Sequence, residues 1–290
     1  MIPPHVRYLT FPDLGSACAA LAAERKYVAL GGGTVVVPEL VRRERHADAM
    51  VELRGLVPDG VTVGEGEVEF GALATYTTVA RDPRLQEAAP LLRQLAAGIT
   101  GGAQLRNQAT LVGSACRAIP SSDVPAALVG LDATMRVQGP SSSRDIAATD
   151  FFLGAFRTAL APGEIVRSVV VPSHPGGYGY LKFKFSESSW PIVTAAAFVR
   201  DGASPGGPRW ATIGVGGLAP VPARVDLDLD GSLPTAADLN DLLAEQTSAY
   251  WSDELADGNY RRSIAGAIAR RALAQAATRH QDSATDRGGE

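Results

Sequence analysis

A run of three glycines and a threonine, residues 31–34, comes directly after the apolar residues 27–30. The apolar run predicts a buried strand, and the glycines predict a sharp turn at its end. Because glycine has no Cβ, the backbone N–H groups of such a turn can approach a phosphate closely. The same pattern is also typical of an ordinary tight turn, so these glycines alone leave both interpretations open.

Two common nucleotide-binding motifs do not account for this turn. Residues 31–36 begin like a dinucleotide-binding fingerprint, but Val36 stands where a third small residue is required, and Pro38 interrupts the expected helix. A Walker A loop is absent from the sequence, because no Gly-Lys-Ser/Thr follows any glycine run. The pattern therefore disfavours a Rossmann fold and a P-loop.

Two later segments carry further polar groups. Residues 106–116 combine small residues with hydroxyls, and residues 120–123 follow with the sequence PSSD. Asp123 is placed either to cap a helix or to accept hydrogen bonds from ribose or ribityl hydroxyls. In residues 180–185 alternation puts two lysines on one face of a strand. Lys182 either faces solvent or compensates the charge of a phosphate.

Composition narrows the chemistry that the chain can perform. The sequence has 290 residues, of which 46% are hydrophobic, so it can bury a substantial core. Its net charge of −4 argues against a nucleic-acid partner. Two cysteines are too few for an iron–sulfur cluster, which takes about four thiolates. The four histidines show no HExxH spacing, so we expect no metal site.

The ends and apolar stretches give no targeting signal. The N-terminus lacks the basic-then-apolar pattern of a signal peptide, and no apolar stretch reaches the ~20 residues of a membrane helix. We therefore expect a cytoplasmic chain without a membrane span. Cys18 and Cys116 are expected to be free thiols, and Cys116 a small buried residue, since no histidine lies near it in the sequence.

The order of the segments predicts an α+β fold in two parts. A cluster of proline and glycine at residues 173–177 is the best boundary, because periodicity lapses there. Three strand-like segments and two helices follow it, which is typical of an antiparallel sheet with helices. The predicted domains are residues 1–175 (lobes of about 1–56 and 57–175), residues 176–278, and a disordered tail over residues 279–290.

Taken together, these segments resemble the FAD-binding medium subunit of the molybdenum hydroxylase family, which includes CO dehydrogenase and xanthine dehydrogenase. Residues 31–34 match its Ala-Gly-Gly-Thr motif, and residues 106–114 match Arg-Asn-x-Gly-Thr-x-Gly-Gly-Asn. Residues 120–123 match its Pro-x-x-Asp. Further landmarks are residues 151–154, 160–165, 180–183 and 260–262. The resemblance covers about residues 4–277.

The resemblance implies a two-lobed PCMH-type FAD-binding domain, followed by a smaller domain of antiparallel sheet plus helices. It implies FAD extended across the two glycine loops, with no catalytic residue from this chain, because the cofactor carries the redox chemistry. Its implied partners are a molybdopterin-containing large subunit and a 2Fe–2S small subunit. The implied FAD contacts are Leu30, Gly31, Gly32, Gly33, Thr34, Val35, Thr100, Thr110, Leu111, Val112, Gly113, Ser114, Asp123, Val166 and Lys182.

Two departures from the family motif matter most for the site. Val112 replaces the first glycine of the Gly-Gly pair, and Ser114 replaces the asparagine. A β-branched side chain at position 112 would be strained if the backbone there had a positive φ. Two alternatives to an electron-transfer subunit therefore stay open. One is a free-standing flavin-dependent oxidoreductase on the same scaffold, and the other is a binding or scaffold protein that has lost FAD.

Overall fold

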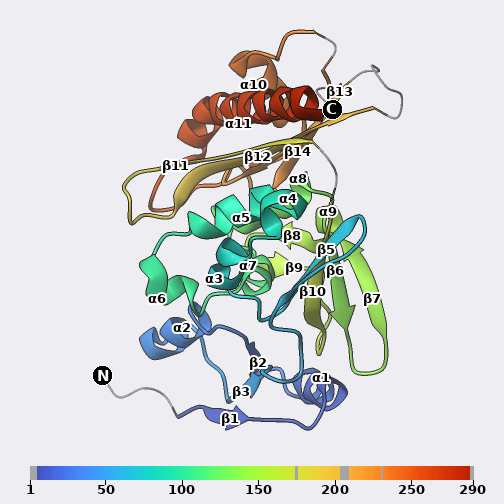
Figure 1. Ribbon diagram of the computed structural model, residues 1–290. Coiled ribbons are helices and arrows are strands. Elements are labelled where there is room, and N and C mark those ends of the chain that lie inside the picture. The colour runs from blue at the N-terminus through green and yellow to red at the C-terminus, as the bar shows by residue number, and fades with distance from the viewer. Residues whose placement is uncertain (1–4, 174–175, 203–208, 230, 288–290) are drawn as a thin grey trace.

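A computed structural model describes residues 5–173, 176–202, 209–229 and 231–287 (Figure 1). The fold is α+β, as predicted, with mixed helices and largely antiparallel sheets. In Figure 1 the N-terminal part, blue to green, lies below the C-terminal part, yellow to red. Within these ranges, no helix is both long and apolar enough to cross a membrane.

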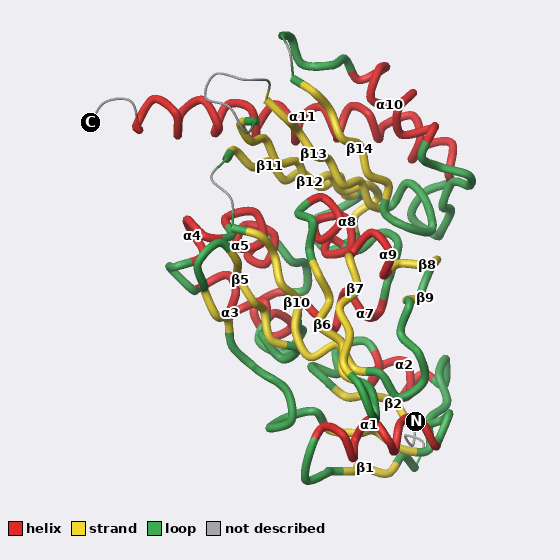
Figure 2. The backbone as a smooth tube through the Cα atoms, turned by 90° about the vertical axis from the view of Figure 1, so that its right-hand side faces the viewer, coloured by secondary structure: helices red, strands yellow, loops and turns green. Residues whose placement is uncertain are grey.

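The chain begins with a small parallel sheet of order β1-β3-β2. Its strands are β1 (Arg7–Leu9), β2 (Tyr27–Leu30) and β3 (Ala49–Glu52). Helix α1 (Leu14–Ala23) begins where the Asp13 carboxylate accepts a hydrogen bond from the Ser16 N–H, at 2.7 Å. The first glycine segment, residues 31–34, joins β2 to α2 (Val36–Arg42). This small sheet lies at the end of the molecule farthest from the C-terminal helices in both views (Figures 1 and 2).

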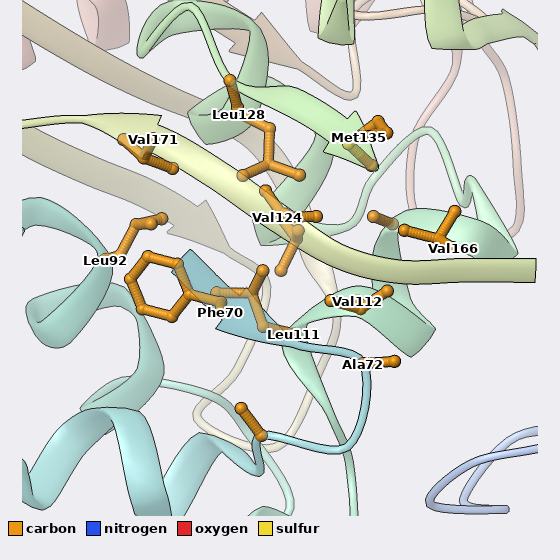
Figure 3. Close-up of a cluster of buried hydrophobic side chains, with 14 of the residues drawn as sticks. Phe70, Ala72, Leu92, Leu111, Val112, Val124, Leu128, Met135, Val166 and Val171 are labelled. Atoms are coloured by element: carbon orange, nitrogen blue, oxygen red, sulfur yellow. The ribbon is translucent and has the colours of Figure 1, made fainter. Parts of the chain in front are cut away.

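A five-stranded antiparallel sheet follows, in the order β4-β5-β10-β6-β7. Its strands are β4 (Val61–Val63), β5 (Glu67–Gly71), β6 (Thr134–Gln138), β7 (Ser143–Ala147) and β10 (Ile165–Pro172). Buried side chains of β5, α5 and β10, among them Phe70, Leu92 and Val171, lie within one hydrophobic cluster (Figure 3). Burial of such side chains stabilises the fold by about 1.5–3 kcal/mol each.

Short helices pack beside this sheet and carry the second glycine segment, residues 106–114. They are α3 (Tyr76–Arg81), α4 (Leu85–Ala88), α5 (Pro90–Ala97), α6 (Gly102–Arg106), α7 (Leu111–Arg117), α8 (Asp123–Gly130) and α9 (Ala148–Phe151). A small hairpin, β8 (Phe152–Gly154) and β9 (Arg157–Thr158), follows α9. Helix α8 is buried along its whole length, because it lies between this part and the C-terminal sheet.

The C-terminal part is a four-stranded antiparallel sheet with two helices on one face (Figure 2). Its elements are β11 (Gly177–Lys184), β12 (Pro191–Asp201), β13 (Arg209–Gly216), β14 (Ala223–Asp228), α10 (Ala236–Glu245) and α11 (Gly258–Arg287). The sequence predicted three of these strands and missed β14. Gly179 lets α11 approach the sheet, since a Cβ there would lie 1.9 Å from the Ala272 carbonyl oxygen.

The predicted disordered tail is wrong over most of its length. Helix α11 continues through Arg287, and residues 288–290 lie outside the described part of the chain. The Arg279 guanidinium lies 4.2 Å from the Tyr178 ring centroid and donates to the Tyr178 carbonyl oxygen at 2.9 Å. The His280 Nε2 lies 2.9 Å from an Asp201 carboxylate oxygen. Polar composition suggested disorder, but these side chains have partners on the sheet that are distant in sequence. Of the predicted boundary at 173–177, residues 174 and 175 lie outside the described ranges.

Candidate functional site

The first glycine segment is an open loop with unused backbone donors. Strand β2 ends at Leu30 and α2 begins at Val36, and Gly33 between them has a φ of +69°, which favours glycine. Within the described ranges, the backbone N–H groups of residues 31–36 donate to no protein acceptor. A row of free N–H groups in a tight turn suits an anionic ligand.

The two glycine segments touch through their backbones. A Cβ on Gly32 would lie 1.9 Å from the Gln108 carbonyl oxygen, so only glycine permits the approach. The second segment then enters α7 at its N-cap Thr110, whose hydroxyl accepts from the Gly113 N–H at 2.9 Å. Segments that are about 75 residues apart therefore form the two sides of one loop pair.

Val112 lies in the first turn of α7 and is not among the non-glycine residues with a positive φ. The strain that its β-branched side chain would cause at a positive φ is therefore absent. Its side chain is 2% exposed and lies near Ala72 and Val166 (Figure 3). Ser114, the other departure from the motif, accepts a hydrogen bond from the Tyr76 hydroxyl at 2.5 Å. Both replacements thus have defined places in the fold.

Both segments line a single cavity of about 370 Å³. Its floor is apolar and includes Ala72, Val112 and Val166, and Trp190 from the C-terminal part also reaches it. Most of the residues predicted from the sequence lie together in its wall. They are Gly31, Gly32, Gly33, Thr34, Val35, Thr110, Val112, Gly113, Ser114 and Val166.

The remaining predicted residues do not line this cavity. Leu30 ends strand β2, and Leu111 is fully buried in the core. Thr100 follows α5, and its hydroxyl is buried without a hydrogen-bond partner in the described structure. Asp123 and Lys182 meet each other at the junction of the two parts of the chain, where Lys182 Nζ lies 3.0 Å from an Asp123 carboxylate oxygen.

The junction around Asp123 is closed and internally paired. Ser122, and not Asp123, is the N-cap of α8, and the Asp123 carboxylate accepts hydrogen bonds from both Lys182 and the Tyr180 hydroxyl. Lys182 Nζ also donates to the Gly98 carbonyl oxygen at 2.6 Å. Burial, together with the neighbouring Asp123 charge, raises the pKa of Tyr180 well above its ordinary value. These contacts join β11 to α5 and α8.

Residues 4–174 match the family model described as the FAD binding domain in molybdopterin dehydrogenase. The chain belongs to this FAD-binding family.

Curated and solved relatives extend the match over nearly the whole chain. The medium subunit of nicotine 6-hydroxylase from Paenarthrobacter nicotinovorans is 28% identical over 284 residues, covering 95% of this chain and 99% of that protein. The medium chain of carbon monoxide dehydrogenase from Afipia carboxidovorans is 31% identical over 86% of this chain and 88% of its own. A chain of the reconstituted CO dehydrogenase from Oligotropha carboxidovorans superposes with a TM-score of 0.83 at 28% identity, covering 96% of this chain and all of its own.

The cavity fits the FAD of this family. The free N–H groups of residues 31–36 and the close approach at Gly32 provide a cradle that an added Cβ would fill. Ala72, Val112 and Val166 give one part of the cavity wall an apolar surface. The chain is thus an FAD-binding member of an oxidoreductase family. When bound, the flavin supplies the redox chemistry, and the protein supplies position and electrostatics.

Three charged residues in the cavity wall escaped the sequence analysis. They are Glu39 on α2, Arg45 after it and Arg117 at the end of α7. The signal that could have found Glu39 is its position as the one charged residue in the apolar stretch 35–41. Cys116, which also lines the cavity, is partly buried, and desolvation raises the pKa of its thiol to about 12, which favours the protonated form.

Proposed function

We propose that this chain is the FAD-binding electron-transfer subunit of a molybdopterin-dependent dehydrogenase. The observation that carries the proposal is the cavity between the two glycine loops, where the N–H groups of residues 31–36 have no protein acceptor. The residues of this cavity would hold FAD, which would supply the electron transfer between an iron–sulfur partner and an external acceptor. The chain's own residues bind and orient the cofactor and take no part in substrate chemistry.

The proposed partners are a molybdopterin-containing large subunit and a 2Fe–2S small subunit. The matched relatives are called medium subunits or medium chains, and this chain aligns with 99% of the length of one of them. Its two cysteines, Cys18 and Cys116, are both free and are too few for a cluster of its own. The chain therefore needs partners for the other redox centres. A cytoplasmic location, where free thiols persist, belongs to the same proposal.

The residues are proposed to divide the work of binding. Residues 31–35 and 110–114 hold the diphosphate and the groups next to it, and Val166 packs against the cofactor from the apolar floor. Asp123, Lys182 and Thr100 hold the end of the cofactor nearest the junction of the two parts. The proposed FAD domain is residues 1–175, with lobes of about 1–56 and 57–175, and residues 176–278 form the second domain.

Neither alternative gains support from the structure. Both depended on Val112 and Ser114 as signs of a damaged site. Val112 adopts a helical backbone without strain, and Ser114 is hydrogen-bonded to Tyr76. A site of this kind gives no reason to expect that FAD has been lost.

Flavin uptake and assembly test the proposal. The purified full-length chain, stripped of cofactor, is titrated with FAD and followed by quenching of flavin fluorescence. We expect saturable binding of one FAD per chain. We also expect a heteromer by size-exclusion when the chain is produced together with the proposed large and small subunits. A chain that takes up no FAD would overturn the cofactor assignment. A homodimer or monomer that binds FAD and turns over a substrate alone would favour the free-standing oxidoreductase.

A further inference from the structure

We propose that Arg117 is a specificity residue for the diphosphate of the cofactor, and that Glu39 positions it from the opposite loop. This inference rests on the proposed function and goes beyond the glycine-loop motifs. Glu39 belongs to α2, which follows the first loop, and Arg117 ends α7, which follows the second. Both residues line the cavity, so an ion pair between them spans the two loops at the site itself.

The ion pair is fixed from several directions. Arg117 Nη2 donates to one oxygen of the Glu39 carboxylate. Arg45 Nε lies 3.0 Å from the other oxygen, and the Glu39 side chain is only 11% exposed. The Arg117 guanidinium also stacks on Phe156, with its carbon 4.7 Å from the ring centroid. The Phe156 N–H donates to the Ala118 carbonyl oxygen at 2.8 Å, which ties this ring to the end of α7.

The charges of this group favour an anion. Two guanidinium groups, on Arg45 and Arg117, surround the single carboxylate of Glu39, so the group carries a net charge of about +1. No such excess is needed to hold Glu39 in place, because one guanidinium would neutralise it. A positive excess beside a loop of free N–H groups complements a ligand with two negative charges next to each other.

Arg117 has donors left for such a ligand. Nη2 is bonded to Glu39, Nη1 donates to no acceptor in the described structure, and the buried Nε also lacks an acceptor. A guanidinium offers five N–H donors in a rigid plane, so it can hold Glu39 and a phosphate oxygen at once. A phosphate oxygen in the cavity would give Nη1 the charged acceptor that the protein does not supply. Lysine lacks this planar fork and could not serve both partners in the same way.

The test compares ligands that differ in their phosphates. Cofactor-free wild type, R117Q and R117K are titrated with FAD and riboflavin, and ADP is tested as a competitor of FAD. R42Q is the matched control. Arg42 lies on α2, the helix that carries Glu39, but it pairs with the exposed Glu44 and does not line the cavity. We expect R117Q to weaken the binding of FAD and ADP by about 10-fold or more, and to change the affinity for riboflavin by less than about twofold. The affinity of R117K for FAD and ADP should lie between those of wild type and R117Q, and the affinity of R42Q should match that of wild type.

E39Q tests the positioning role. Without the carboxylate the guanidinium loses its fixed acceptor. E39Q should therefore bind ADP more weakly than wild type does, and the loss should be smaller than in R117Q. The double variant E39Q/R117Q should bind ADP no more weakly than R117Q alone, because Glu39 acts through Arg117. Tighter or unchanged ADP binding in E39Q would remove Glu39 from the proposal.

The outcomes separate this inference from the proposed function. If wild type takes up no FAD, the proposed function itself fails. If wild type binds FAD, and R117Q and R117K bind FAD and ADP as tightly as wild type does, Arg117 has no role in recognising the diphosphate. If both variants lose riboflavin in parallel with FAD and ADP, Arg117 only supports the loops. If R117Q does not fold, as judged by thermal unfolding, R117K and E39Q decide between these results.

Discussion

The cavity between the glycine loops and the junction around Asp123 contain most of the residues predicted to bind FAD, yet they differ in how far their polar groups are already satisfied. At the first glycine loop the N–H groups of residues 31–36 have no protein acceptor. At the junction the Asp123 carboxylate accepts from Lys182 and Tyr180, and Lys182 also donates to the Gly98 carbonyl oxygen. The loops are prepared for a ligand, whereas the junction first holds the two parts of the chain together.

The sharpest test of the loop region is Gly32→Ala. An added Cβ would lie 1.9 Å from the Gln108 carbonyl oxygen, so the loops must separate and the cradle is lost. We expect no detectable FAD binding, measured by flavin absorbance of the purified protein. Gly60→Ala is the control, since a Cβ there meets no atom within 4 Å and the φ is not positive. Normal FAD binding by the Gly32 variant would show that contact between the loops is not needed for the site.

At the junction, Asp123→Asn should lower the free energy of unfolding by about 3 kcal/mol even without FAD. The side chains of Asp123 and Lys182 are only 5% and 12% exposed, and the change leaves a buried ammonium without its counter-charge. Urea unfolding of the cofactor-free protein measures the effect. Glu187→Gln, which removes an exposed partner of Lys184 on the loop after β11, should change it little.

The comparison would break down if Asp123→Asn destabilised only the FAD-bound protein. In that case the carboxylate would serve the cofactor alone, and its pairing with Lys182 would add nothing to the stability of the cofactor-free fold. A loss of stability both with and without FAD would confirm that the pair holds the two parts of the chain together whether or not the cofactor is bound.

Val112→Gly restores one glycine of the family motif and should still be harmful. The change removes a side chain that is 2% exposed and places glycine in the first turn of α7. We expect a loss of about 2–3 kcal/mol in the free energy of unfolding, from the missing apolar contacts and the more flexible backbone. FAD affinity should not improve, because Val112 has no positive φ to relieve. Val37→Ala, at a half-exposed position of α2, is the control. Tighter FAD binding by Val112→Gly would mean that the valine side chain obstructs the cofactor.

The smallest expected effect concerns Glu164, which lines the cavity. The Arg144 guanidinium, bonded at 2.8 Å, lowers the pKa of the Glu164 carboxyl. Because the folded pKa is lower than the unfolded one, this contribution to stability is present above the ordinary glutamate pKa of about 4.3 and is lost as the pH falls through the lowered value. Arg144→Gln should reduce the urea midpoint at pH 7, by less than Asp123→Asn or Val112→Gly.

A pH series checks the cause of that effect. The difference between wild type and Arg144→Gln should shrink toward zero as the pH falls below about 4, because protonation removes the same interaction in wild type. A difference that stayed constant down to pH 3 would point to lost packing of the Arg144 side chain instead.

Local sequence was sufficient for the elements whose signals are short-range. The apolar run ending at Leu30 and the glycines after it predicted the right strand and turn, because such signals depend on a few neighbouring residues. Helix α11 was missed beyond Ala277, since Arg279 and His280 are held by Tyr178 and Asp201 far along the chain. No local pattern reveals such partners.

For the site, the sequence named both glycine loops but not the charges between them. Arg45 lies close to Glu39 in the sequence, but Arg117 lies 78 residues beyond Glu39 and becomes its neighbour only when the loops pack together. Conversely, Asp123 and Lys182 were predicted as cofactor contacts, and the fold places them in a buried pair outside the cavity wall.

The sequence by itself determined which backbone segments can bend closely enough to hold a diphosphate, because only glycine permits the contact at Gly32 and the positive φ at Gly33. It also determined the family, through motifs spread along the chain. The tertiary structure decided which polar groups remain available to a ligand. Hydrogen bonds between distant residues, such as Asp123 with Tyr180, satisfy some groups and leave others free, and that outcome depends on packing that local sequence does not encode.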